Sequence, residues 1–410
     1  MRKQAVIFVL LVLILFLFNK IFMAEFVKTS TIIDTQDLVN KDIVTSEKLF
    51  DNSWKIIKNN YFDKTLNEQN WKRWQKHYEG KIKTDEDAAL AVNTMLASLN
   101  DPYSKYLNKK EYEDQNTSID SKIMGIGVNI SGESGKIVVV SVIEGTPAYQ
   151  AKLQAKDIII AIDGKDVKGM NISDVASLVR GKENSFVNIT VMRNKQKITK
   201  KIQRAEIKIK TIKSSVDKNI GYIQILTFIG ARAPNEFVEA LEKTENTDGL
   251  ILDLRGNTGG LLPNAVFIAN MFITKGNIVS IVGRNGYKKD IQAQSNEYSI
   301  KKPLLVLIDG GSASASEILS GALKDYHRAK LIGTTTFGKG MVQKIIPMPN
   351  RTGLNLTIAK YLTPAGHDIN KKGIKPDILV NITAKDYIAQ KDVQLEKAKI
   401  IMAEMLKSQK

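Results

Sequence analysis

The stretch between Leu304 and Gln343 constrains the fold more than any other part of the 410-residue chain. It begins with five apolar residues, Leu304 to Ile308, a length typical of a buried strand. An Asp-Gly-Gly turn ends this run, and apolar residues then recur at helical spacing as far as Leu323. The pattern predicts a strand, a tight turn and a helix.

Three serines follow the predicted turn, at positions Ser312, Ser314 and Ser316. Small residues at this place let backbone N–H groups face a ligand, and the positive end of the new helix points at the same spot. A serine here could attack a carbonyl carbon, and the neighbouring amides could hold the oxyanion that forms.

A nucleophilic serine needs a base to take its proton, and the sequence offers two kinds. The chain has three histidines, His77, His327 and His367. His327 follows the predicted helix and His367 lies in a Gly-rich turn, and neither of these two has an obvious carboxylate to orient it. The other candidate is Lys339, which stands between two glycines. An exposed lysine near pH 7 is neutral only about once in a few thousand molecules, but burial can lower its pKa by several units and make it a usable base.

Two short segments resemble the active site of a known family. They read Ser312-Ala313-Ser314-Ala315-Ser316-Glu317 and Phe337-Gly338-Lys339-Gly340, followed by Gln343. This is similar to the C-terminal processing peptidases, also called tail-specific proteases. The resemblance implies that Ser314 is the nucleophile, that Lys339, 25 positions later, is the general base, and that Gln343 helps to position the lysine.

Two other interpretations fit parts of the same region. The serine-rich segment alone could be an ordinary helix start, since serine is a common N-cap. Residues 333–339 also satisfy the phosphate-loop pattern G-x-x-x-x-G-K. That loop requires Ser or Thr after the lysine and then a helix, whereas Gly340 follows here and a β-branched run ending at Pro347 predicts a strand. We therefore prefer the peptidase interpretation.

The resemblance also implies how the oxyanion is held. The segment from Arg255 to Gly260 follows an apolar run at 249–254 that predicts a buried strand. In the family, a glycine amide at this place joins the amide after the nucleophile. Ala315 would thus be one donor and Gly259 or Gly260 the other, and the sequence does not decide between the two glycines.

The resemblance covers about residues 46–384 and implies a multidomain α/β protein. We expect a helical N-terminal domain at 27–118, a PDZ domain at 119–205, a catalytic domain of the crotonase-like (ClpP/crotonase) type at 206–384, and a helical C-terminal tail at 385–410. We expect Asp253 and Arg255, at a strand end, to fix a turn by local hydrogen bonds rather than to act in catalysis.

The predicted PDZ domain rests on strands at 137–142, 157–162 and 186–192, with a Gly-rich entry before them. In that fold, backbone amides of the Gly-rich loop hold the C-terminal carboxylate of a peptide, which adds as a strand beside the sheet. Here the loop would be Gly125, Ile126, Gly127 and Val128. Arg180, after the second helix, could be regulatory or simply a cation at a helix end.

The amino terminus predicts export. Residues 5–18 are free of polar side chains and follow Arg2-Lys3, so 1–26 would be a signal peptide or an uncleaved membrane anchor. The chain would then lie outside the cytoplasmic membrane, periplasmic or extracellular. It has no cysteine, which fits an exported protein that relies on its core.

The net charge of +17 invites a nucleic-acid interpretation, but the lysines are scattered in pairs without interleaved aromatic residues, so we expect no nucleic acid. No metal cluster or cofactor motif occurs in the sequence. The sequence therefore predicts an envelope serine endopeptidase acting on proteins or peptides with free C-termini. The sequence leaves open whether the N-terminal helices join two copies into a homodimer. The alternative to a peptidase is a catalytically silent PDZ scaffold or adaptor.

Overall fold

The computed structural model describes residues 43–119, 123–133, 135–170, 172–207, 210–294 and 300–408. They form two compact units, a smaller one at Asn116–Ile209 and a larger one made of the chain before and after it. The predicted signal or anchor segment at 1–26 lies outside the described residues. Among the residues that are described, no helix combines the length and apolarity needed to cross a membrane.

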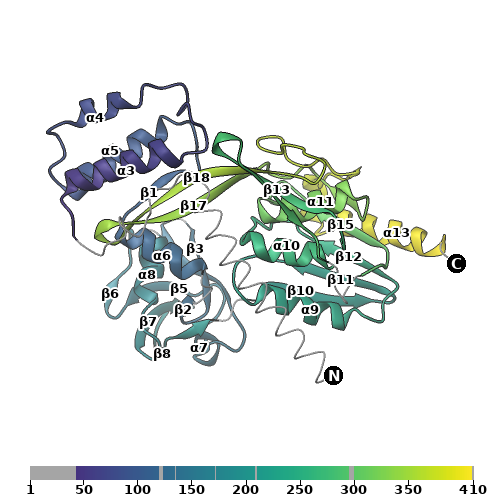
Figure 1. Cartoon of the computed structure of the whole chain (residues 1–410). Coiled ribbons are helices and arrows are strands. Elements are labelled where there is room, and N and C mark those ends of the chain that lie inside the picture. The colour runs from purple at the N-terminus through teal and green to yellow at the C-terminus, as the bar shows by residue number, and fades with distance from the viewer. Residues whose placement is uncertain are drawn as a thin grey trace, which may run out of the picture. The chain divides into compact units, whose positions relative to one another are not determined.

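A six-stranded sheet forms the centre of the larger unit (Figure 1). Its strand order is β10-β11-β12-β15-β16-β19, and all neighbours are parallel except β10 and β11. Every residue of β12 and β15 is buried, as expected for central strands of a parallel sheet with helices on both faces. The strands are β10 Ile212–Asp217, β11 Ile220–Ile225, β12 Gly249–Asp253, β15 Leu304–Ile308, β16 Lys330–Gly333 and β19 Ile378–Leu379.

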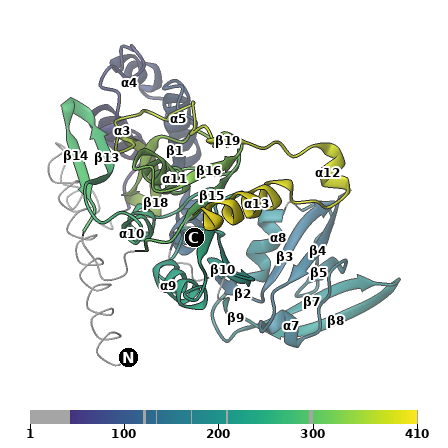
Figure 2. The same cartoon turned by 90° about the vertical axis from the view of Figure 1, so that its right-hand side faces the viewer.

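Helices cover both faces of this sheet. Alternate side chains of a strand point to opposite faces, and β15 follows this rule. Val306 and Ile308 pack in a core with helices α9, α10 and α11, whereas Leu305 and Leu307 pack with α13 on the other face (Figure 2). These helices are α9 Ala233–Lys243, α10 Leu262–Asn270, α11 Ala315–Asp325 and α13 Val393–Lys407. A short helix, α12 Ala384–Ile388, precedes α13.

The C-terminal tail is helical as predicted, and it is also part of the core. Ala398 and Met402 of α13 are fully buried against the sheet. Met402 fills the space over Gly249, where an added Cβ would lie 2.4 Å from its sulfur. The polar, amphipathic pattern of the tail therefore reflects one buried stripe.

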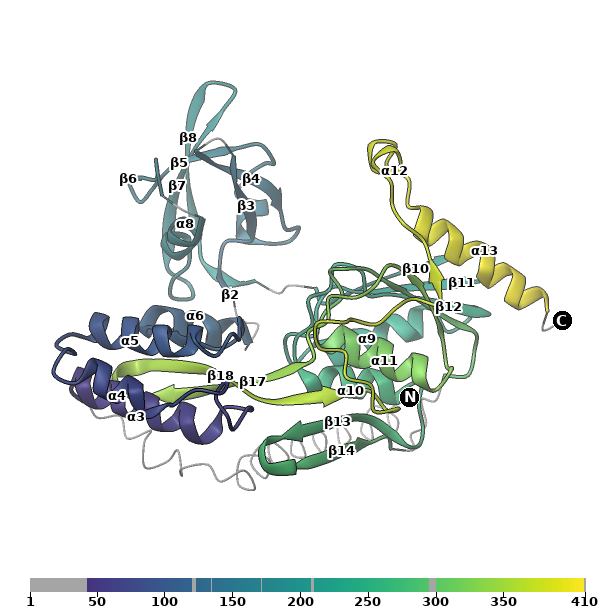
Figure 3. The same cartoon turned by 90° about the horizontal axis from the view of Figure 1, so that it is seen from above.

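A second, five-stranded sheet links this core to the N-terminal helices. Its two longest strands, β17 and β18, run side by side away from the six-stranded sheet toward α3 and α5 (Figure 3). Leu354, Leu356 and Ile346 from these strands share one hydrophobic cluster with Leu49 and Met95 of the helices. The elements are α3 Ser46–Asn60, α4 Lys72–Tyr78, α5 Asp85–Ala97, β1 Lys105–Leu107, α6 Lys109–Ile119, β13 Asn277–Gly283, η1 Arg284–Gly286, β14 Lys288–Gln292, β17 Met341–Met348, η2 Pro349–Arg351 and β18 Thr352–Leu362.

Because of this shared cluster, the N-terminal helices and the six-stranded sheet belong to one compact unit rather than to two. The sequence treated them as separate domains because the contacts join residues about 300 positions apart, beyond the reach of a periodicity argument.

The smaller unit is a β-sheet with two short helices. Strands β3, β4, β5, β7 and β8 form the sheet in that order, β6 pairs with β5, and β2 pairs with β9. Alternate residues of β7, Val187, Ile189 and Val191, are fully buried in its core. The elements are β2 Ile123–Gly125, β3 Val128–Glu133, β4 Lys136–Val142, α7 Pro147–Gln150, β5 Ile158–Ile162, β6 Lys165–Asp166, α8 Ile172–Val179, β7 Phe186–Arg193, β8 Gln196–Gln203 and β9 Ala205–Ile207.

Candidate active site

Ser314 stands at the turn between strand β15 and helix α11, where the sequence predicted a nucleophile. Its backbone has φ 55° and ψ −113°, a conformation that residues other than glycine rarely adopt. Such strained residues persist only where their surroundings hold them, and they cluster at active sites. Ser314 is half-buried, so its side chain can be reached from outside the core.

The two neighbouring serines have structural roles. Ser312 Oγ donates a hydrogen bond of 2.8 Å to Leu254 O and accepts one of 3.0 Å from Asp309 N. Ser316 Oγ donates to Asn257 O at 2.8 Å. Both side chains are fully buried. They tie the loop after β12 to the turn that carries Ser314, so of the three serines only Ser314 suits a nucleophile.

Lys339 is half-buried in the loop between β16 and β17. Burial lowers the pKa of its amine below the ordinary lysine value, and the carboxylates of Asp101 and Glu317 act in the opposite direction. Its Nζ lies 4.9 Å from the centre of the Tyr103 ring. Within the described part of the chain, no hydrogen bond joins this amine to Ser314. The structure therefore brings the predicted base to the active-site region, but not into hydrogen-bond contact with the nucleophile.

Gln343, the third predicted site residue, lies on β17. Its Nε2 donates a long hydrogen bond of 3.4 Å to Thr357 Oγ1 on β18. The contact that the family resemblance implied, between this side chain and Lys339, is not formed among the residues described.

The two candidate oxyanion glycines differ in their hydrogen bonds. Gly259 N donates to Asn257 Oδ1 at 2.9 Å, so that amide is already used. Gly260 pairs with Phe228 in a parallel β-bridge. Both hydrogen bonds of this bridge are made by the backbone of Phe228, so the N–H of Gly260 points away from Phe228. In the described structure neither Gly260 N nor Ala315 N donates a hydrogen bond.

Gly259 instead lies against Ser314. Its φ is 106°, and an added Cβ would lie 2.8 Å from Ser314 Cβ and 3.0 Å from Ala315 N. A side chain at position 259 would therefore fill the space in front of Ser314 and of the backbone amide of Ala315.

The Gly-rich loop of the smaller unit also leaves amides unpaired. Gly127 has φ 87°, and an added Cβ would lie 2.3 Å from Thr146 Oγ1, so only glycine fits. Among the residues that the structure describes, no acceptor within the protein takes a hydrogen bond from the N–H groups of Ile126 and Gly127, whereas Gly127 O accepts from Ile143 N. Val128 begins β3, Gly125 ends β2, and Arg180 directly follows α8.

The histidines lie on exposed parts of the larger unit. His77 is on α4, and His327 follows α11. The expectation that neither His327 nor His367 has a carboxylate beside it is wrong for His367, whose Nδ1 lies 3.6 Å from Asp325 Oδ1. The two residues are 42 positions apart in a turn and a helix end, so only the fold pairs them. The imidazole remains 70% exposed.

Tyr103 was not recognised as a site residue from the sequence. It belongs to the segment Asp101 to Ser104 in the N-terminal part of the chain, and it reaches the active-site lysine only because that part packs beside β18. The only local signal there is the run Asp101-Pro102-Tyr103-Ser104, which does not indicate the contact with Lys339.

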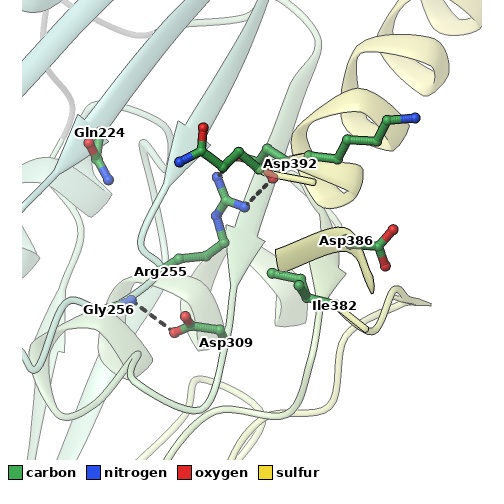
Figure 4. Close-up of a pocket in the computed structure, with 9 residues that line it drawn as sticks. Gln224, Arg255, Gly256, Asp309, Ile382, Asp386 and Asp392 are labelled. Atoms are coloured by element: carbon green, nitrogen blue, oxygen red, sulfur yellow. Dashed lines mark hydrogen bonds and ion pairs between the residues drawn. The ribbon is translucent and has the colours of Figure 1, made fainter. Parts of the chain in front are cut away.

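Asp253 and Arg255 have the structural role that the sequence predicted. Arg255 N donates to Asp253 Oδ1, and the guanidinium of Arg255 forms an ion pair with the buried Asp253. The same guanidinium pairs with Asp392, the N-cap of α13 (Figure 4). Arg255 and Asp392 border an open pocket of about 580 Å³ together with Gly256 and Asp309. Gly256 N donates a hydrogen bond of 2.9 Å to Asp309 Oδ1. The network fixes the start of α13 to the loop that leads to Gly259 and Gly260.

Comparison with known proteins places these features in a family. Residues 219–380 match Peptidase family S41, and residues 138–193 match the PDZ domain. The chain is 34% identical over 369 residues to a carboxyl-terminal-processing protease of Synechocystis sp., covering 86% of each chain. It is 40% identical over 303 residues to the carboxy-terminal processing protease CtpA of Bacillus subtilis, covering 72% of this chain and 65% of that protein.

A solved structure agrees with the sequence comparisons. The photosystem II D1 C-terminal processing protease matches with a TM-score of 0.57 and 31% identity, over 83% of this chain and 94% of that one. With 34% identity to a relative over most of both chains, a matching peptidase domain and a matching PDZ domain, the chain belongs to the carboxyl-terminal processing proteases of peptidase family S41, and it is a serine-type peptidase.

Proposed function

We propose that this peptidase works with a Ser-Lys dyad formed by Ser314 and Lys339. The observation that carries the proposal is the half-buried Lys339, whose pKa is lowered by burial, in a loop hydrogen-bonded to the helix that Ser314 begins. A neutral amine is the form that can accept a proton, and burial favours it over the ammonium.

The chemistry then follows from these two residues. Ser314 Oγ forms a bond to the scissile carbonyl carbon while its proton moves to Lys339 Nζ. Collapse of the tetrahedral intermediate breaks the C–N bond, and Lys339 returns the proton to the leaving amine. Water, deprotonated by neutral Lys339, then hydrolyses the acyl-ester and restores the Ser314 hydroxyl.

The dyad requires Lys339 to leave the ring of Tyr103 for Ser314. A cation is attracted to the face of an aromatic ring, so the present position suits the protonated amine. Catalytic hydrogen bonds are often open without substrate and tighten when it binds. Gln343 would then orient the amine, starting from its weak bond to Thr357.

The amides of Ala315 and Gly260 would hold the oxyanion. Both lack an acceptor within the described residues, and Gly259 N is committed to Asn257, which favours Gly260 over Gly259. Gly259 would keep the space in front of Ser314 open for the substrate carbonyl.

The depressed pKa of Lys339 predicts the pH dependence. We expect kcat/KM for a peptide substrate to rise with pH along a limb centred below the ordinary lysine pKa of 10.5, because protonated Lys339 cannot accept the Ser314 proton. Initial rates across a pH series measure this limb.

Chelation by EDTA should leave the rate of peptide hydrolysis unchanged. A rate that EDTA abolishes and zinc restores would contradict the dyad.

The proposal extends to substrate choice by the PDZ domain. The free amides of Ile126 and Gly127, in the loop from Gly125 to Val128, could hold a terminal carboxylate while the peptide adds as a strand. The enzyme would then cleave proteins and peptides that end in a free carboxylate next to an apolar side chain.

We expect an unstructured peptide with an apolar last residue to be cleaved about tenfold faster as the free acid than as the C-terminal amide, because a charge-assisted hydrogen bond contributes roughly 1.5 to 3 kcal/mol. Measuring kcat/KM for both forms tests this, since amidation leaves the scissile bond unchanged. The difference should shrink when residues 119–205 are deleted. Equal rates for acid and amide across several peptides would reduce the PDZ domain to a tether.

Three parts of the proposal concern the setting of the enzyme. Residues 1–26 would export the chain and anchor it on the outer side of the cytoplasmic membrane. The N-terminal helices could join two copies into a homodimer, and Arg180 could take part in regulation.

The parallel order β11-β12-β15-β16 supports a crotonase-like catalytic fold.

The sequence alone left a catalytically silent PDZ scaffold as the alternative to a peptidase. Incubating the full-length protein and its Ser314→Ala variant with an unfolded protein such as casein separates the two, because a scaffold would leave casein intact in both samples.

A further inference from the structure

Glu317 is fully buried in the first turn of α11 and accepts four hydrogen bonds. Its Oε1 accepts from Thr336 Oγ1 at 2.6 Å and from Gly338 N at 2.7 Å. Its Oε2 accepts from Ser314 N and from Lys339 N, each at 2.9 Å. A single carboxylate oxygen therefore joins the backbone N–H groups of the nucleophile and the base.

Tyr361 of β18 makes the matching connection on the carbonyl side. Its hydroxyl lies 3.1 Å from Ser314 O and is also hydrogen-bonded to Lys339 O. Its backbone N–H donates to Gly340 O at 3.0 Å. The side chain is buried, and burial holds the pKa of Tyr361 well above its ordinary value, so the hydroxyl stays protonated and can donate.

The hydrogen bonds of Glu317 and of Tyr361 reach the same two residues, Ser314 and Lys339, whose positions the proposed mechanism depends on. Ser314 has a backbone conformation unusual for a side-chain-bearing residue, and Lys339 lies in a loop between two glycines. Neither would be held by local structure alone. Hydrogen bonds to a carboxylate are stronger than neutral ones, and they gain further strength in a dry interior.

We propose that Glu317 and Tyr361 are positioning residues that clamp the backbones of Ser314 and Lys339 into one rigid unit, Glu317 through the N–H groups and Tyr361 through the carbonyls. The inference rests on the proposed role of Lys339 as base. Neither residue touches the reacting atoms in this scheme.

The clamp also sets the charge around the base. Lys339 faces the carboxylates of Asp101 and Glu317, which raise the pKa of its amine against the effect of burial, and the rings of Tyr103 and Tyr361 carry no charge near neutrality. Removing the charge of Glu317 should therefore lower the pKa of Lys339 further and move the acid limb of kcat/KM to lower pH.

The first test is Glu317→Gln in the full-length protein. The amide replaces one carboxylate oxygen with an NH2 group, which cannot accept a hydrogen bond. At the position of Oε2 it loses the bonds from Ser314 N and Lys339 N, and at the position of Oε1 it loses the bond from Gly338 N, and the remaining bonds become bonds to a neutral group. We expect kcat/KM to fall by about a hundredfold, mainly in kcat, because a misplacement of about 1 Å costs on that order. We also expect the acid limb to shift to lower pH, which a merely structural role would not produce.

Tyr361→Phe provides an independent variant that keeps the ring and the packing. It should lower kcat/KM by roughly tenfold and leave the pH of the limb unchanged, because no charge is removed. The double variant should lose clearly less than the product of the two single losses, since both side chains hold the same pair of residues.

Glu236→Gln is the matched control. Glu236, in the first turn of α9, accepts from Thr211 N, Thr211 Oγ1 and Ile212 N, but joins no site residue. The Glu236→Gln variant should have a lower melting temperature than the wild type, and the acid limb of its kcat/KM should stay at the wild-type pH. The clamp would be overturned if Glu317→Gln kept the wild-type kcat/KM and the wild-type pH of its acid limb. It would also be overturned if the loss of kcat/KM in the double variant equalled the product of the two single losses. Activity in Lys339→Ala would instead overturn the dyad, so the two failures are distinguishable.

Discussion

Ser314→Ala is expected to lower kcat/KM by roughly 10⁴- to 10⁶-fold, the scale on which serine peptidases respond to loss of the nucleophile. Without Oγ no acyl-enzyme can form, and only the amides of the site would still assist attack by water. The measurement is hydrolysis of a fluorogenic peptide by the full-length protein, with circular dichroism to show that the fold is kept.

Ser312→Ala and Ser316→Ala are the matched controls, because they remove the same hydroxyl from the same turn. Each buried hydroxyl ties the loop after β12 to α11, so its loss should cost about 1 to 3 kcal/mol of unfolding free energy. The folded fraction should keep most of its activity. Hydrolysis by Ser314→Ala at the rate of these controls would exclude Ser314 as the nucleophile.

Lys339→Ala should lower kcat/KM by about 10²- to 10⁴-fold, the usual range for loss of a general base. His77→Ala, His327→Ala and His367→Ala should each retain at least about a tenth of the activity, because these side chains are exposed. The same peptide assay gives all four values.

Lys344→Ala is a closer control for the lysine. Lys344 is also half-buried, and burial also lowers the pKa of its amine, but it lies on β17 beyond the dyad. Its loss should affect stability far more than kcat. If Lys344→Ala or a histidine variant is inactive while Lys339→Ala works, Lys339 is not the base.

The local sequence determined the elements that carry the site. The apolar run at 304–308 and the helical spacing after it predicted β15 and α11 with the turn at Ser314 between them. The run ending near Pro347 predicted a strand, which is β17, and not the helix that a nucleotide loop requires. These predictions succeed because periodicity and turn residues act over a few neighbouring positions.

Only the tertiary structure decided what these elements meet. The sequence could not choose between Gly259 and Gly260, because the choice depends on a hydrogen bond to Asn257 and a bridge to Phe228. It could not show that Tyr103 reaches Lys339.

The proposed clamp around Ser314 and Lys339 is the clearest case. In the sequence, Glu317 was the last residue of the serine-rich segment and had no role of its own, and no contact was predicted for Tyr361. Their meeting at Ser314 and Lys339 depends on β18 and the loop after β16 packing against the start of α11. A buried carboxylate is costly unless it is fully hydrogen-bonded, and its partners here come from positions up to 22 residues away, so folding alone brings them together.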